Sequence, residues 1–140
     1  MILVTKKTKT LWWSFVFLLL VLIDQLVKCL VRDIFKNDLF AFSLPLPSWM
    51  MFAVYAIILF FIIRYCIKSY KIFSSYQWFA WTLILAGAAL NIGERIILGY
   101  VRDFIFITTG VFNLADGYII AGVVILLFFG LLKNNANYAK

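Results

Sequence analysis

The chain is organised around residues 84–116, which read ILAGAALNIGERIILGYVRDFIFITTGVFNLAD. This stretch connects two strongly apolar segments, yet it contains three of the protein's six acidic residues, Glu94, Asp103 and Asp116. A charged side chain at the centre of a membrane-spanning helix costs about 2.5–3.5 kcal/mol. Because such groups are expensive, a cluster of them in or beside a membrane indicates a functional site. We therefore expect the functional site in this stretch.

The composition of the whole chain is that of an integral membrane protein. Of its 140 residues, 66% are hydrophobic and 14% are charged, and the mean hydropathy is +1.03. A soluble domain is about 45–50% apolar and about 25% charged. At about 20 residues per span, the chain has room for four spans with short connections. We expect residues 1–140 to form one all-α, membrane-embedded domain.

Residue types that bind metals or activate nucleophiles are scarce. The sequence has no histidine, which excludes histidine both as a general base and as a zinc ligand. The two cysteines, Cys29 and Cys66, do not form a CxxC pair, and Ser43 has no base beside it. We expect no metal, no cofactor and no disulfide framework.

Four apolar segments are predicted to span the membrane. They cover about residues 11–31, 49–67, 76–98 and 112–132. Pro45 and Pro47 argue against a helix in the first connection, where residues 39–44 could be a short strand or a segment lying on the membrane. The connector 99–111 alternates in character, which favours a short hairpin or an extended element.

The distribution of charge predicts the orientation. Eight of the thirteen basic residues fall on one side of the predicted spans: Lys6, Lys7, Lys9, Arg64, Lys68, Lys71, Lys133 and Lys140. All six acids belong to the other side or to the span ends that face it. By the positive-inside rule, both termini are cytoplasmic and the acids face outward. The net charge of +7 therefore reflects topology, and we expect no nucleic-acid partner.

Two groups of polar residues share a helical face. Asp24 and Lys28 are four residues apart near the end of the first span, where they can pair. Taken alone, they could be a helix-end ion pair that extends to the membrane surface. Asn91, Glu94 and Arg95 share a face of the third span. Taken alone, these could be a packing interface in which Glu94 and Arg95 neutralise each other.

A third group, Asn113 and Asp116, begins the fourth span, where Asp116 could simply cap a helix. Together, however, three of the four spans carry polar groups at the same end. Two carboxylates about 3 Å apart share a proton, so one can activate water while the other protonates a carbonyl oxygen. We expect Asp103 and Asp116 to form such a pair, with apparent pKa values that belong to the pair.

Four motifs in order resemble those of the signal peptidase II family, the bacterial lipoprotein signal peptidases. The motifs, which cover essentially residues 11–132, are Asp24-Gln-Leu-Val-Lys28, Asn37-Asp-Leu-Phe-Ala-Phe-Ser43, Ala86-Gly-Ala-Ala-Leu-Asn-Ile-Gly-Glu-Arg95 with Gly99-Tyr-Val-Arg-Asp-Phe-Ile105, and Phe112-Asn-Leu-Ala-Asp116. The resemblance implies an aspartyl endopeptidase of the cell inner membrane with Asp103 and Asp116 as the catalytic pair. It also implies that the following residues support the site or hold the substrate: Asp24, Lys28, Asn37, Gly87, Asn91, Glu94, Arg95 and Asn113.

The resemblance further implies the substrate and the architecture. The substrate would be a prolipoprotein carrying diacylglyceryl on a cysteine, cut just before that cysteine. The fold would be four transmembrane helices with a small extracytoplasmic β-cradle and a short extracytoplasmic helix. We expect a monomer among membrane lipids, with the active site at the outer face.

The sequence departs from the family pattern at a few positions. Glu94 stands where the family usually has Asp, Leu39 and Phe40 replace small residues, and Leu90 replaces a glycine. Only twelve residues separate Asp103 from Asp116. These changes affect the supports of the site, and both aspartates are present.

Two other functions stay open from the sequence. One is a small transporter or channel subunit that uses the acids as a proton or cation relay. The other is a catalytically silent relative that grips a lipopeptide without cutting it. A relay should distribute its acids through the membrane depth, whereas these acids cluster at one end.

Overall fold

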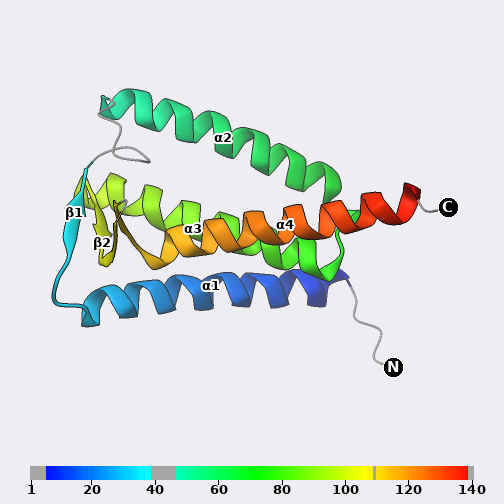
Figure 1. Cartoon of the computed structure of the whole chain (residues 1–140), viewed down its shortest axis with the longest axis horizontal. Coiled ribbons are helices and arrows are strands. Elements are labelled where there is room, and N and C mark those ends of the chain that lie inside the picture. Colours follow the sequence, from blue (N-terminus) through cyan, green and yellow to red (C-terminus); the bar gives the residue numbers. More distant parts are fainter. Residues whose placement is uncertain (1–5, 39–46, 109, 139–140) are drawn as a thin grey trace.

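The computed structural model describes residues 6–38, 47–108 and 110–138. The elements in chain order are helix α1 (Lys6–Leu30), strand β1 (Phe35–Asn37), helix α2 (Ser48–Ser69), the short 3₁₀ helix η2 (Tyr70–Ile72), helix α3 (Ser75–Leu98), strands β2 (Val101–Asp103), β3 (Ile105–Ile107) and β4 (Gly110–Phe112), and helix α4 (Leu114–Tyr138). The four predicted apolar segments thus fall on four long helices (Figure 1).

The helices have the length and apolar character of a membrane protein. Among the described residues, three helical segments are long and apolar enough to cross a membrane: Thr8–Leu30, Trp49–Ser69 and Ser75–Leu98. The apolar part of α4, Leu114–Gly130, is shorter. Most large apolar side chains of α1 and α2 are exposed, which is stable only against an apolar surrounding such as lipid.

Helix α3 is the centre of the fold, and the core lies along it. Its buried side chains include Ala80, Leu83, Ile84, Ala86 and Leu90. Figure 1 shows α3 and α4 together, with α1 and α2 on opposite sides of this pair. The ribbon of α2 diverges from the pair toward the end that carries the strands.

Two glycines let α3 and α4 approach closely. A Cβ on Gly87 would collide with the carbonyl oxygen of Ala115, and one on Gly122 would lie 2.6 Å from the carbonyl oxygen of Ala80. Small residues allow such backbone contact between membrane helices, where packing drives association. This contact sets the position of α4 relative to α3.

The strands form two small antiparallel sheets at one end of the bundle (Figure 1). Strand β1 pairs with β2, with Phe35 opposite Asp103, and β3 pairs with β4, with Ile105 opposite Phe112. The hairpin favoured for residues 99–111 is therefore confirmed, in the form of β3 and β4.

The connection between α1 and α2 is described only in part. Its described residues contain β1 and no helix, whereas the strand or surface segment expected at residues 39–44 lies outside the described residues. Helix α3 ends at Gly99, whose φ of 84° is the left-handed conformation that favours glycine. The turn leads the chain directly into β2, which carries Asp103.

Candidate active site

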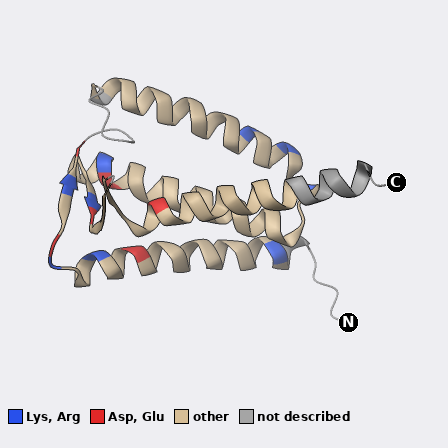
Figure 2. Ribbon diagram, in the orientation of Figure 1, with Lys and Arg blue, Asp and Glu red and all other residues tan. Residues whose placement is uncertain are grey.

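All six acids lie toward the strand end of the bundle (Figure 2). The opposite end carries Lys and Arg residues of α1 and α2. The clustering of acids expected from the sequence is therefore confirmed. Two groups of buried and half-buried carboxylates can be distinguished within this cluster.

The Asp103 carboxylate is buried and receives two hydrogen bonds. Its side chain is 1% exposed. The Asn37 amide donates to Oδ2 at 2.7 Å, and the Asn113 amide donates to Oδ1 at 2.6 Å. Asn37 is the diagonal neighbour of Asp103 across the β1–β2 pair, because its direct partner is Val101. The short sheet thus brings a residue of the first connection to the carboxylate.

The Asp116 carboxylate lies in the first turn of α4, opposite Asn91 of α3. Asn113 precedes the helix, and its side-chain oxygen accepts the backbone N–H of Asp116 at 3.0 Å. In return, the backbone N–H of Asn113 donates to Asp116 Oδ2 at 3.1 Å. This is a capping box, so Asp116 does cap the helix. The other oxygen, Oδ1, accepts the Asn91 amide at 2.7 Å.

Asn113 connects the two carboxylates. Its amide nitrogen donates to Asp103 and also to the side-chain oxygen of Asn91, at 3.1 Å, while Asn91 donates to Asp116. The link between Asp103 and Asp116 therefore runs through two amide side chains. Among the described residues, the hydrogen bonds to both carboxylates come from amide groups, and neither carboxylate forms a salt bridge.

Burial raises the pKa of the Asp103 carboxyl above its ordinary value. The hydrogen bonds from Asn37 and Asn113 lower this pKa, the charge of Asp116 raises it, and the charge of Lys28 lowers it. The loss of water around the carboxylate outweighs the donated hydrogen bonds. Asp103 is therefore the carboxyl of this site that we expect to hold a proton.

A second group of buried charges lies beside this pair. The Lys28 ammonium is 3.0 Å from Asp24 Oδ2 and 3.1 Å from Glu94 Oε1. Glu94 also forms a salt bridge of 2.7 Å with Arg102. Asp24, Lys28 and Glu94 are all at most 5% exposed. The group ties α1, α3 and β2 together.

Two interpretations of these residues from the sequence need correction. The Asp24–Lys28 pair forms, but it is buried and does not extend to the membrane surface, because Glu94 of α3 packs against it. Glu94 pairs with Lys28 and Arg102 and not with Arg95, because β2 returns to the end of α3. The Arg95 guanidinium lies over the Tyr55 ring of α2, 5.8 Å from its centroid.

Three residues of the candidate site were not predicted from the sequence. Gln25 and Arg102 belong to the charged group, and Tyr55 contacts Arg95. Gln25 lies inside the Asp24–Lys28 motif, which is a usable signal. The sequence gives no signal for Arg102 or Tyr55, because their contacts depend on how β2 and α2 are placed.

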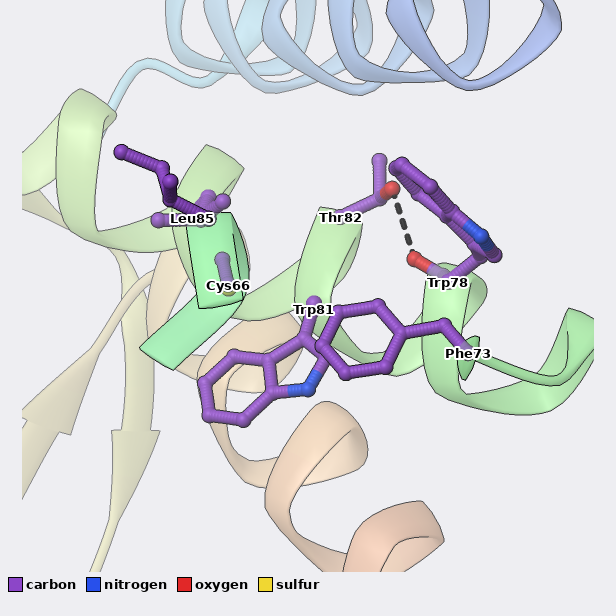
Figure 3. A pocket seen from close by; sticks show the side chains of 7 residues that line it. Cys66, Phe73, Trp78, Trp81, Thr82 and Leu85 are labelled. Carbon is purple, nitrogen blue, oxygen red and sulfur yellow. Dashed lines mark hydrogen bonds between the residues drawn. The ribbon is translucent and has the colours of Figure 1, made fainter. Parts of the chain in front are cut away.

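A separate cavity of about 240 Å³ lies among Cys66, Ile67, Phe73, Trp78, Trp81, Thr82 and Leu85 (Figure 3). The Thr82 hydroxyl donates to the carbonyl of Trp78 at 2.8 Å. The cavity is lined by residues of α2, of α3 and of the connection between them, and it lies apart from the carboxylates described above. Among the described residues, no group of three or more Asp, Glu or Cys side chains could hold a metal ion.

The fold and the site define a class: a helical membrane protein in which a buried carboxylate and a half-buried one are linked through asparagine side chains at one end of the bundle. A family model described as "Signal peptidase (SPase) II" matches residues 16–132. The chain therefore belongs to the signal peptidase II family.

Several relatives share the name "Lipoprotein signal peptidase". That of Thermodesulfovibrio yellowstonii is 31% identical over 82% of this chain and 91% of the relative, and that of Streptococcus pneumoniae is 30% identical over 86% and 92%. That of Caldicellulosiruptor bescii is 42% identical, but the match spans 63% of this chain and 58% of the relative. A solved "Bacterial membrane enzyme structure" has a TM-score of 0.70 at 24% identity over 89% of this chain and 90% of that chain, which shows the same fold.

Proposed function

We propose that this protein removes signal peptides from prolipoproteins as an aspartyl endopeptidase, with Asp103 and Asp116 as the catalytic pair. The observation that carries the proposal is the amide-mediated link between these two carboxylates. Amides orient the carboxylates without neutralising them, so a proton can be held and passed on. Membership of the signal peptidase II family supports the reaction type.

The mechanism follows from the surroundings of each carboxylate. Asp103 is the more deeply buried, and its raised pKa favours the protonated form. Asp116 lies at a helix N-terminus and accepts a backbone N–H, an arrangement that favours negative charge. Asp116 takes a proton from water as the oxygen attacks the scissile carbonyl, and Asp103 donates its proton to the carbonyl oxygen. As the tetrahedral intermediate collapses and the C–N bond breaks, Asp116 gives its proton to the leaving amine and Asp103 takes back a proton from the intermediate's hydroxyl, which restores both carboxyls.

The remaining predicted residues hold this pair in place. Asn37, Asn91 and Asn113 orient the carboxylates, and Gly87 lets α4 approach α3. Asp24, Lys28 and Glu94 fix the strand that carries Asp103. Arg95, near Tyr55, faces the side of α2 and is proposed to hold substrate.

The topology belongs to the same proposal. All four helices, α1 to α4, would span the inner membrane as one domain of residues 1–140, with both termini cytoplasmic. The strand end would then face outward, which is supported by the excess of basic residues, eight of thirteen, on the opposite side of the predicted spans. The substrate would be a diacylglyceryl-modified prolipoprotein, cut before its lipidated cysteine by a monomeric enzyme.

The test is cleavage of a diacylglyceryl-modified prolipoprotein by purified protein in detergent. We expect Asp103→Asn and Asp116→Asn each to lose about 10²–10⁴ in rate, because each removes one proton-transfer group. Asp33→Asn, a matched change of an exposed acid near the same end, should retain activity. Folding of each variant is checked by its thermal unfolding.

The outcomes separate the alternatives. Product from wild type and Asp33→Asn only would establish the pair. Lipopeptide binding without product from any protein would indicate a silent binder, and absence of both would favour the transporter.

A further inference from the structure

We propose that Arg102, together with Gln25, is a positioning residue that fixes Asp103 in its catalytic orientation. It acts through Glu94 and does not touch the reacting atoms. This inference rests on the proposed function, because it concerns the geometry of the proposed catalytic pair.

The carboxylate of Glu94 binds Arg102 in three places. Its Oε2 accepts the backbone N–H of Arg102 at 2.8 Å. Its Oε1 accepts Nε at 3.0 Å and Nη2 at 2.7 Å. Charge-assisted bonds of this kind are the strong ones and also restrict direction. One side chain of α3 therefore grips both the main chain and the side chain of the residue before Asp103.

Gln25 of α1 also binds Arg102, and we call the contacts of Arg102 with Glu94 and Gln25 the grip. The Gln25 side-chain oxygen accepts Arg102 Nη2 at 2.6 Å, and its amide donates to Asp24 at 3.1 Å. Arg102 is thus held between two helices, α1 and α3. Its side chain is only 21% exposed, so water competes little for these bonds.

The strand geometry transmits this grip to Asp103. Strand β2 has three residues, so its pairing with β1 alone gives it few hydrogen bonds. Successive side chains point to opposite faces of a strand. Fixing Arg102 on one face therefore sets the direction of Asp103 on the other, toward Asn37 and Asn113.

The grip also has an electrostatic side. Asp24 and Glu94 carry two negative charges and Lys28 and Arg102 two positive charges, so the group is neutral. Asp103 is bordered by Lys28 of α1, Arg102 and Glu94 beside it, and Asp116 of α4. Loss of the Arg102 charge would leave a net negative charge near the catalytic pair, which disfavours ionisation of both carboxyls.

The experiment compares Arg102→Met, Arg102→Lys, Glu94→Gln and the double variant Glu94→Gln/Arg102→Met in the cleavage assay. Lys36→Met is the matched control, because Lys36 lies opposite Arg102 in the β1–β2 register but is exposed and outside the grip. For each protein, kcat, KM, the pH–rate profile and thermal unfolding are measured.

We expect Arg102→Met to lower kcat about 10–100-fold with little change in KM, because a displaced carboxyl is costly to the reaction. Its pH–rate profile should move to higher pH, because the loss of a positive charge disfavours the ionised form of a nearby carboxyl. Arg102→Lys should recover the wild-type profile and part of the rate. The double variant should lose about as much as the worse single variant, because both single changes break one unit.

Three results would overturn the proposal. One is an active Arg102→Met with an unchanged profile. Another is a rate loss that Arg102→Lys does not relieve and that comes with no pH shift, which would mark a merely structural role. The third is an equal effect of Lys36→Met. An inactive wild-type protein would instead overturn the proposed function itself, so the two failures are distinguishable.

Discussion

The two groups of carboxylates at the strand end, all buried except the half-buried Asp116, are built differently. The ion cluster consists of Asp24, Lys28, Glu94 and Arg102, and each carboxylate in it has a cation within 3.1 Å. The amide-held pair consists of Asp103 and Asp116, whose hydrogen bonds among the described residues come from amide groups. Both groups lie at the same end of one bundle.

This difference suits the ion cluster to a structural role and the amide-held pair to the proposed proton transfer. In the ion cluster, opposite charges balance each other and fix α1, α3 and β2 to one another. A buried ion pair is costly to break because the remaining partner is left uncompensated. In the amide-held pair, Asp103 forms no salt bridge among the described residues, and burial raises its pKa more than its hydrogen bonds and the charge of Lys28 lower it. Under the proposed function, the same kind of side chain holds elements together in one group and carries a proton in the other.

The largest effect is expected from breaking the ion cluster. Lys28→Met should lower the free energy of unfolding by about 3–5 kcal/mol, because the buried Asp24 carboxylate would lose its ion-pair partner and Glu94 would keep only Arg102. The measurement is unfolding in detergent followed by circular dichroism. The double variant Asp24→Asn/Lys28→Met should recover much of the loss, because it restores neutrality. Equal losses in both variants would mean that the cluster does not act through charge balance.

A second prediction tests whether the amide-held pair depends on close helix contact. Gly87→Ala should cost about 1–3 kcal/mol of stability, because its Cβ would collide with the Ala115 carbonyl and lie 2.7 Å from Ile119 Cγ1. Since Ala115 precedes Asp116, cleavage should fall further than stability alone explains.

The matched control for Gly87 is Gly93 on the same helix. A Cβ there would meet nothing within 4 Å, so Gly93→Ala should stabilise α3 by about 0.5–1 kcal/mol and retain activity. Similar behaviour of the two alanine variants would show that the α3–α4 contact does not position Asp116.

The sequence predicted the helices because long apolar segments have few alternatives in a membrane. It placed most of their ends within a few residues, but α1 begins at Lys6 and not near residue 11, and α4 ends at Tyr138 and not near residue 132. Lysines and other polar residues outside the apolar core can still continue a helix. For the connector after Gly99, the sequence favoured a short hairpin or an extended element, and the hairpin is one of these two forms. The pairing of β1 with β2 could not be predicted from three-residue strands, which carry too short a pattern to define a register.

The sequence predicted most of the residues that belong to the candidate site, but it did not predict most of the contacts between them. Spacing along one helix predicted the Asp24–Lys28 pair, which depends only on helical geometry. Taken alone, Glu94 and Arg95 could have neutralised each other, but the salt-bridge partners of Glu94 are Lys28 of α1 and Arg102 of β2, which sequence spacing does not indicate. The role of Arg102 has no local signal, since a single arginine beside an aspartate is ordinary in any sequence.

The smallest effect expected is a shift of the pH–rate profile, and it probes the amide-held pair directly. The Asn37 amide donates to Asp103 Oδ2, and this hydrogen bond lowers the pKa of that carboxyl. Asn37→Leu removes the donor. Without this donor the pKa of Asp103 rises further, so the alkaline limb of the profile, where the proposed acid loses its proton, should move to higher pH by about 1 unit, the worth of one hydrogen bond to a charged group. Asp38→Asn, next in sequence and exposed, should move it less because water screens its charge.

The raised pKa of Asp103 in Asn37→Leu should also change how the stability of the folded protein depends on pH. A carboxyl whose pKa is raised by folding contributes stability that is complete below its ordinary pKa and is lost as pH rises through the folded value. Burial already places Asp103 in this position, and Asn37→Leu widens the interval between the two pKa values. As pH rises from acid to neutral, the unfolding temperature of the variant should therefore fall further below that of wild type. A profile that moves to lower pH would contradict the view that amides, and not cations, hold the charge of this pair.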